Sequence, residues 1–217
     1  MESSKNIFRK KLTREKGIIY SARVISAIFS PFYLALVGLI FVFTFSYLNM
    51  LPLGFRLQVL ALVFVFTILL PTFFIRLYRH SNGWSRLELG HQHRRIVPYV
   101  ISIICYLACY WLIDRVNIFH IVATILMSAL FIQIVCAFVN IGWKISTHTA
   151  AIGGVAGALV AFAEKFSFNP VWWLCLVLIV SGVLGSARMI LRQHSLSQVL
   201  MGFAVGFVCA FIGVTFL

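Results

Sequence analysis

Long stretches without Asp, Glu, Lys or Arg constrain this chain more than any other feature of its sequence. A helix needs about 20 mostly apolar residues to cross a bilayer core, and its backbone hydrogen bonds close within the segment. The stretches are Val24–Phe55, Leu57–Ile75, Ile96–Ile113, Val116–Trp143, Ile145–Ala163, Phe166–Ala187 and Ser195–Leu217. They predict an all-α, polytopic transmembrane bundle of about seven helices. With 62% hydrophobic and 11% charged residues, the composition excludes a water-soluble globule and a disordered chain.

Local sequence features refine this prediction. The first stretch contains a turn at Asn49–Gly54, so its helix is expected to run from Val24 to near Leu48. Pro71 is expected to kink the second helix. The fifth helix is rich in Gly and Ala, and because small residues allow close helix approach, we expect it inside the bundle. The five cysteines lie in apolar stretches and indicate neither a metal site nor a disulfide framework.

The distribution of charge predicts topology. Residues 1–23 form a basic N-terminal segment with seven Lys/Arg residues, and 24–217 form the bundle. The first apolar stretch is too long for a cleaved signal, so we expect an uncleaved anchor. With seven crossings, the N-terminus and the turns at 76–95, 144 and 188–194 share one side, which holds 15 of the 18 Lys/Arg residues. Basic short loops stay cytoplasmic, so this side is predicted to face the cytoplasm. The uncleaved anchor and the single compact bundle favour a bacterial inner membrane.

Polar residues gather in three clusters on that side, at 86–98, 144–148 and 188–198. Ionisable residues in a membrane bundle are candidates for function. His194 and Gln198 are four residues apart on one helix face, so Gln198 is positioned to accept the Nδ1–H of His194. Ser146 and His148 stand at the opening of a helix, where backbone N–H groups favour an anion. Two histidines, arginines and a serine with few carboxylates predict a phosphate site, in which one histidine attacks phosphorus and the other protonates the leaving oxygen.

These residues resemble motifs of the type 2 phosphatidic acid phosphatase (lipid phosphate phosphatase) family: Lys-x6-Arg-Pro, Pro-Ser-Gly-His and Ser-Arg-x5-His-x3-Asp. The third motif corresponds here to Ala187-Arg188-x5-His194-x3-Gln198, and the second to Ile145-Ser146-Thr147-His148. The first motif is divergent, with Arg95 followed by Pro98 and no matching lysine. The resemblance covers about 86–206 and implies a six-helix phosphatase core.

The resemblance also implies residue roles. His194 would be the nucleophile and His148 the acid for the leaving group, while Gln198 would replace the aspartate that orients the nucleophile. Arg188, Ser146 and Arg95 would bind the phosphate. The implied reaction proceeds through a phosphohistidine and uses no metal or cofactor. Ala187 lacks the family's hydroxyl, although Ser186 is adjacent.

The predicted function is hydrolysis of a membrane lipid phosphate or pyrophosphate, with phosphatidic acid, phosphatidylglycerol phosphate and polyprenyl pyrophosphate as candidates. The predicted partner is thus a membrane lipid, not a nucleic acid. One alternative is a decayed relative that binds lipid phosphates without turnover, because Gln198 carries no negative charge. A transporter or channel fits less well, because the ionisable residues gather at one end of the helices rather than along a path to the midplane.

Overall fold

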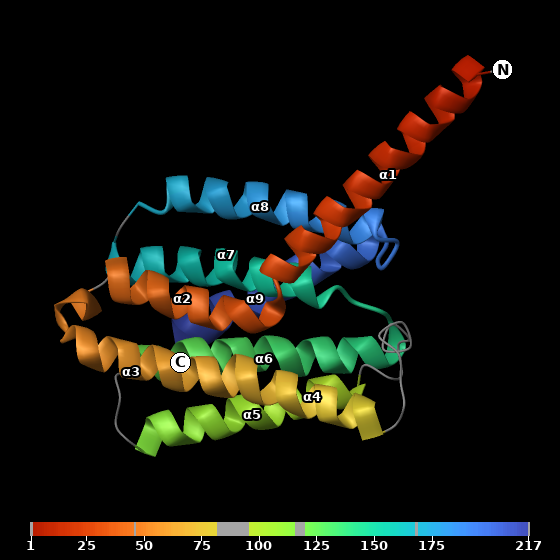
Figure 1. Ribbon diagram of the computed structural model, residues 1–217. Helices are drawn as coiled ribbons and strands as arrows, with labels where there is room; N and C mark the ends of the chain where they lie inside the picture. The colour runs from red at the N-terminus through yellow and green to blue at the C-terminus, as the bar shows by residue number, and fades with distance from the viewer. Residues whose placement is uncertain (1, 46, 82–95, 116–119, 168, 217) are drawn as a thin grey trace.

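The computed structural model describes residues 2–45, 47–81, 96–115, 120–167 and 169–216, and within these ranges the chain folds into helices and turns without strands. The helices are α1 (Glu2–Ile28), α2 (Pro31–Phe45), η1 (Tyr47–Met50), α3 (Leu53–Phe64), η2 (Val65–Leu69), α4 (Leu70–Ser81), α5 (Ile96–Arg115), α6 (His120–Gly142), α7 (Thr147–Phe166), α8 (Val171–Ile190) and α9 (Leu196–Phe216). Most lie roughly parallel or antiparallel to one another, while α1 projects beyond one end (Figure 1). The predicted all-α membrane bundle is confirmed.

The number of spans differs slightly from the expected seven. Six helices are long and apolar enough to cross a membrane, with a seventh only if α1 and α2 together make one bent span. The predicted continuous helix from Val24 to Leu48 is wrong, because the two segments meet at an angle of 73°. Pro31 explains the break: it has no backbone N–H to donate, and its ring disfavours helical geometry in the preceding residue. Pro31 stands at the first position of α2, where both effects are tolerated.

The second span runs continuously from Leu53 to Ser81 through α3, η2 and α4. Its irregularity is a π-helical turn, Val65–Leu69, that ends just before Pro71. A wider turn of this kind accommodates a proline inside a helix, because the ring and the missing N–H both disturb the regular α-helical ladder. The disturbance expected at Pro71 therefore takes the form of a π-helical turn.

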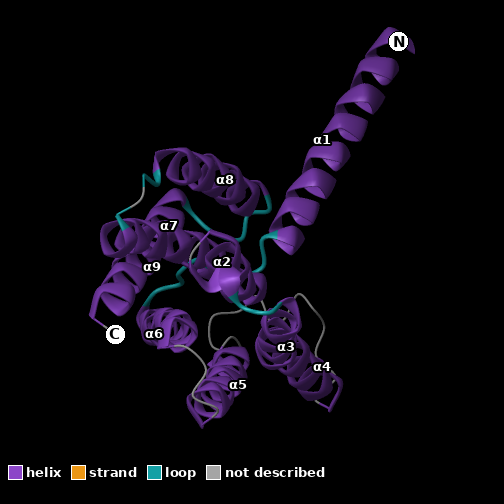
Figure 2. Cartoon of the chain, turned by 90° about the vertical axis from the view of Figure 1, so that its left-hand side faces the viewer, coloured by secondary structure: helices purple, strands orange, loops and turns teal. Residues whose placement is uncertain are grey.

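Helix α7 is the most enclosed span, as its Gly and Ala content predicts. Of its most apolar window 56% is buried, against 22–44% for the other five spans. It packs against α2, α6, α8 and α9, and the end-on view shows it among these helices (Figure 2).

Glycines set the contact between α7 and α9, which run in the same direction. A Cβ atom added at Gly153 or Gly157 would overlap the backbone of Phe203 or Phe207, and one added at Gly206 would overlap the backbone of Ala150. Both helices thus place small residues one turn apart against the partner's carbonyl groups. The two helices form a closely fitted pair.

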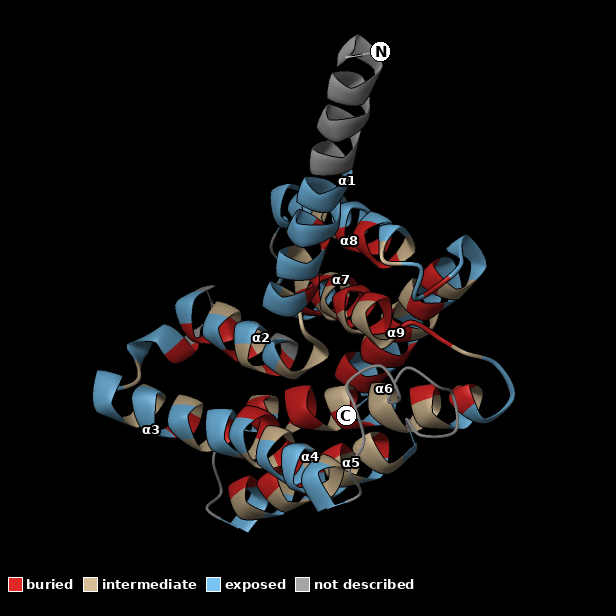
Figure 3. Cartoon of the chain, turned by 45° about the vertical axis from the view of Figure 1, so that its right-hand side comes forward, coloured by how far each residue is buried: buried red, intermediate tan, exposed pale blue. Residues whose placement is uncertain are grey.

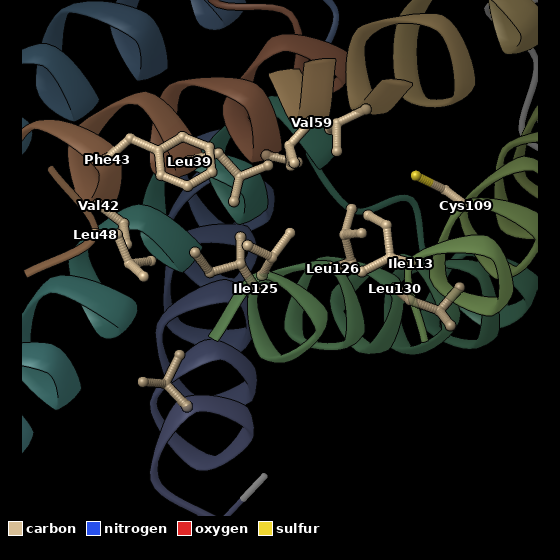
Figure 4. Close-up of a cluster of buried hydrophobic side chains, with 14 of the residues drawn as sticks. Leu39, Val42, Phe43, Leu48, Val59, Cys109, Ile113, Ile125, Leu126 and Leu130 are labelled. Carbon is tan, nitrogen blue, oxygen red and sulfur yellow. The ribbon is translucent and has the colours of Figure 1, made fainter. Parts of the chain in front are cut away.

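A second packed region joins α2, α3, α5 and α6 through buried aliphatic side chains (Figure 4). Leu39, Val63, Ile113 and Leu126 are inaccessible to solvent there. The outward faces of the helices remain exposed and largely apolar, as in the pale blue surfaces of α3 and α8 (Figure 3). This distribution is what a bundle needs when its outer surface faces lipid instead of water.

Candidate functional site

The start of α7 places Ser146 and His148 at a helix N-terminus, as the sequence predicts. Ser146 is the N-cap residue and is fully buried, and its Oγ accepts a hydrogen bond from the backbone N–H of Thr149 at 3.5 Å. The Thr149 hydroxyl in turn donates to the carbonyl of Ser146 at 3.0 Å. His148 is the second residue of the helix, where the N–H groups of the first turn and the helix dipole favour an anion.

The turn between α8 and α9 brings the chain back toward α7. The N–H of Gln193 donates to the carbonyl of Arg188 at 3.1 Å, and the N–H of Arg192 donates to Met189 at 2.8 Å. This pair of bonds is a Schellman motif, which requires a left-handed residue after the helix. Arg192 takes that conformation with φ of 51°. Its side chain is exposed and does not line the cavity described below, which fits a role outside the site.

Gln198, the third residue of α9, caps the helix and contacts the His194 ring with the same side chain. Its Oε1 accepts from the backbone N–H of Ser195 at 3.3 Å, while Ser195 Oγ accepts from the N–H of Gln198 at 3.5 Å. These reciprocal bonds form a capping box. The same Oε1 lies 3.1 Å from Nδ1 of His194, the contact expected from the four-residue spacing.

The capping box also defines the tautomer of His194. The amide atom that accepts from the Ser195 N–H must be the oxygen of Gln198, and the same atom faces Nδ1 of His194. Because an amide oxygen can only accept, Nδ1 of His194 carries the proton. In the neutral ring the lone pair is then on Nε2. His194 is only 6% exposed, and Nε2 is shielded from solvent.

The two histidine segments are in direct contact although they are distant in sequence. The backbone N–H of Ser146 donates to the carbonyl of Gln198 at 3.4 Å. Gly202 is so close to the start of α7 that an added Cβ would lie 2.6 Å from the carbonyl oxygen of Ser146. The expected return of the chain to one end of the bundle therefore occurs for both segments.

Arg188 is buried and contacts α1, a helix that the sequence did not connect to the site. Its Nη1 donates to the Oγ of Ser26 in α1 at 2.7 Å, and the two side chains are each 7% exposed. A buried guanidinium needs such polar contacts to offset the loss of hydration. Ser186, noted as a possible source of the hydroxyl that Ala187 lacks, is exposed while Ala187 and Arg188 are buried. No motif or periodicity marks Ser26.

A cavity of about 650 Å³ extends from His148 and Arg188 along α7 as far as Phe162. Fourteen residues of helix separate its two ends on α7, about 21 Å along the axis. Most of its wall is apolar and comes from α2, α5, α6, α7 and α8, for example Phe41, Ile125 and Val155. His194 is not among the lining residues. Arg95, the other predicted phosphate ligand, and the rest of the first motif up to Arg95 lie outside the described residues.

Comparison with known proteins supports the interpretation of this region. Residues 133–217 match the model of the PAP2 superfamily, a stretch that spans the second half of α6 and all of α7, α8 and α9 up to the C-terminus. It includes both histidine segments and Arg188. The superfamily generally comprises phosphatases, so the match supports hydrolysis of a phosphate ester. Among curated proteins and solved structures, none matches this chain.

Proposed function

We propose that this protein is an integral-membrane phosphatase that hydrolyses a lipid phosphate or pyrophosphate through a phosphohistidine. The observation that carries the proposal is the contact between the starts of α7 and α9, through the Ser146 N–H and the Gln198 carbonyl. It brings the segments with His148 and His194 to one end of the bundle. The superfamily match over the same segments supports phosphate chemistry.

In this mechanism His194 is the nucleophile. Its Nδ1 proton stays on the hydrogen bond to Gln198, which leaves the Nε2 lone pair to attack phosphorus. An N–P bond forms as the bond from phosphorus to the lipid oxygen breaks, and protonated His148 donates its proton to that oxygen. A water molecule then attacks the phosphohistidine, His148 accepts its proton, and the N–P bond breaks to release phosphate.

Arg188, Ser146 and Arg95 would bind the phosphate oxygens. Arg188 presents a planar guanidinium that matches two oxygens, and it lines the same cavity as His148. The N–H groups at the start of α7 would add a partial positive charge near the Ser146 hydroxyl. The described cations and dipoles at this end of the cavity therefore favour the doubly charged head of a phosphate monoester.

The apolar cavity supports a lipid as the substrate. A phosphate near His148 and Arg188 would leave an attached hydrocarbon chain to follow the wall of α7 toward Phe162. A free sugar or nucleotide phosphate would instead place polar groups against apolar side chains, at a cost in desolvation. Phosphatidic acid, phosphatidylglycerol phosphate and polyprenyl pyrophosphate are the candidate substrates.

Phosphate release from the purified protein in detergent tests the proposal. We expect His194→Ala and His148→Ala to lower the rate by about 10²- to 10⁴-fold each, the contribution typical of a positioned acid, base or nucleophile. His120→Ala is the matched control, because His120 opens α6 and contacts Thr124 in its own helix. Equal rates in the wild type and all three variants would overturn the proposal.

A binding protein without turnover is the second candidate, and one observation favours it. The capping box accounts for Gln198 by helix structure alone, without any catalytic role. This candidate predicts that a lipid phosphate binds at stoichiometric levels with no phosphate release, and that Gln198→Glu does not create activity.

We also infer that the site end of the bundle faces the cytoplasm of a cell membrane, because most Lys and Arg residues are on that side of the predicted topology. Gly142→Cys tests this inference at an exposed position just before α7. We expect a membrane-impermeant maleimide to label it in inverted vesicles and not in intact cells. Labelling only in intact cells would reverse the orientation.

A further inference from the structure

Helix α1 has two faces with different surroundings. Ala22 and Ser26, one turn apart, are buried, and α1 packs there against α8. Lys16, Tyr20 and Arg23 follow one another at helical spacing on another side of α1, and all three are exposed. The bundle therefore holds the last turns of α1 by one face and leaves the other face accessible.

The direction of α1 differs from that of the bundle. Helix α2 lies roughly parallel to the membrane-spanning helices, and α1 turns away from it by 73° (Figure 1). A helix at this angle to the spans is closer to parallel with the membrane surface than to perpendicular. It projects from the end of the bundle at which α8 ends, and the end-on view shows it leaving the bundle sideways (Figure 2). This placement puts α1 in the headgroup layer on the side of the candidate site.

The residues of α1 suit that layer. Residues 1–23 contain seven Lys/Arg and two Glu residues. Tyr20, Val24 and Ile28 form an exposed, largely apolar stripe at intervals of four residues, and exposed Lys16 and Arg23 flank it. Such a stripe is unfavourable in water, whereas an interfacial helix buries it at the boundary of the acyl chains. Tyrosine rings and the long stems of Lys and Arg favour the same boundary, with the charged ends among the headgroups.

We propose that α1 is an interfacial helix that binds the anionic headgroups of the membrane around the bundle. The stripe of Tyr20, Val24 and Ile28 enters the edge of the acyl layer, and the cations of α1 contact lipid phosphates. The buried face carries Ser26, whose hydroxyl accepts from Arg188. Lipid binding therefore also holds Ser26 against Arg188. The importance of this link for turnover rests on the proposed function, in which Arg188 binds the substrate phosphate.

Hydrogen exchange of the full-length protein in lipid nanodiscs tests the binding. The discs contain phosphatidylcholine alone or mixed with phosphatidylglycerol, which is anionic but is not a phosphate monoester. We expect the amides of α1 before Ala22 to exchange about 10-fold or more slowly in the anionic discs, because a helix bound to the surface opens less often. The amides of α9 should exchange equally in both. Equal exchange of α1 in the two discs would overturn the proposal and favour a protein as its partner.

Two matched pairs of substitutions separate a specific surface from net charge. Lys16→Gln with Arg23→Gln removes two exposed cations from α1. Arg76→Gln with Arg192→Gln removes two exposed cations at the ends of α4 and α8, on the same side of the bundle. In anionic discs we expect the first pair to speed the exchange of α1 by about 10-fold and the second pair to leave it unchanged. Equal effects of the two pairs would overturn the proposal.

The link to Arg188 is tested by the effect of Ser26→Ala on phosphate release in the same two discs. Comparing variant and wild type in one membrane cancels the effect of surface charge on the local concentration of substrate. We expect Ser26→Ala to raise KM by about 10-fold in anionic discs and by less in phosphatidylcholine discs, where α1 is not held. An equal rise in both would overturn the link. If the wild type releases no phosphate, the proposed function fails, and the exchange experiment alone decides whether α1 binds lipid.

Discussion

The α7–α9 unit and the helices that precede it are built on different principles. Residues 133–217 match a phosphatase superfamily, and there glycines bring two helices together and hydrogen-bonded caps position the polar residues. Before this stretch, α2, α3 and α5 pack together largely through aliphatic side chains, and α2 and α5 supply much of the cavity wall. Under the proposed function, the first unit would carry the chemistry, while the surrounding helices would determine what can reach it.

The largest expected effect tests the close packing of the first unit. Gly206→Ala places a methyl group against the backbone of Ala150, and we expect overpacking to destabilise the fold by about 1–3 kcal/mol or more. Gly182→Ala is the control, because its Cβ would meet no atom within 4 Å. It should be neutral or stabilise by up to about 1 kcal/mol. Thermal unfolding in detergent measures both, and equal shifts would contradict the role of the glycines.

The next effect tests the link between the two regions. Ser26→Ala removes the hydroxyl that accepts from Arg188, and we expect kcat/KM for phosphate release to fall by about 10-fold, mainly through KM. Ser26→Thr should restore most of the loss because it keeps the hydroxyl. Ser21→Ala is the control, because Ser21 is on the same helix and its hydroxyl donates to the Ile18 carbonyl of its own turn. A loss of stability without a change in KM would show that the contact is only structural.

The next prediction concerns the charge next to His194, which a substitution of Gln198 changes without changing the size of the side chain. Gln198→Glu keeps the length of the side chain and both acceptor contacts, and it adds a negative charge beside the imidazolium that forms on His194. We expect kcat to rise by up to about 10-fold, because the added charge stabilises the cationic ring. Steady-state phosphate release measures the change. A fall in kcat with unchanged folding would indicate that the neutral amide is required.

The smallest effect concerns the turn that joins α8 to α9. Arg192 has a φ of 51°, a conformation that costs an L-residue about 1–2 kcal/mol and a glycine almost nothing. Arg192→Gly should therefore stabilise the fold by about 1 kcal/mol and leave phosphate release unchanged. Chemical or thermal unfolding checks the first expectation. A loss of activity would place Arg192 in the site after all.

The sequence predicts the bundle from the length of its apolar stretches and the central position of α7 from its small residues. It predicts that the two histidine segments lie at the same end of the bundle because two membrane-spanning helices separate them along the chain. The break before α2 was readable from Pro31, and the capping box from Ser195 and Gln198, since both depend on local residue type. The contact between Ser26 and Arg188 joins residues 162 positions apart and has no local signal. The cavity was equally hidden, because its wall exists only when several helices pack.

Because Gln198 Oε1 contacts both the His194 ring and the backbone at the start of α9, the orientation of that ring depends on the first turn of the helix. To turn its ring or exchange the protonated nitrogen, His194 would have to give up the oxygen that also holds the first turn of α9. Fraying of that turn would free the His194 ring to rotate, and re-forming the turn would restore the orientation of the ring. Conditions that loosen the start of α9, such as a detergent that competes for the interface, should therefore abolish turnover before they unfold the bundle.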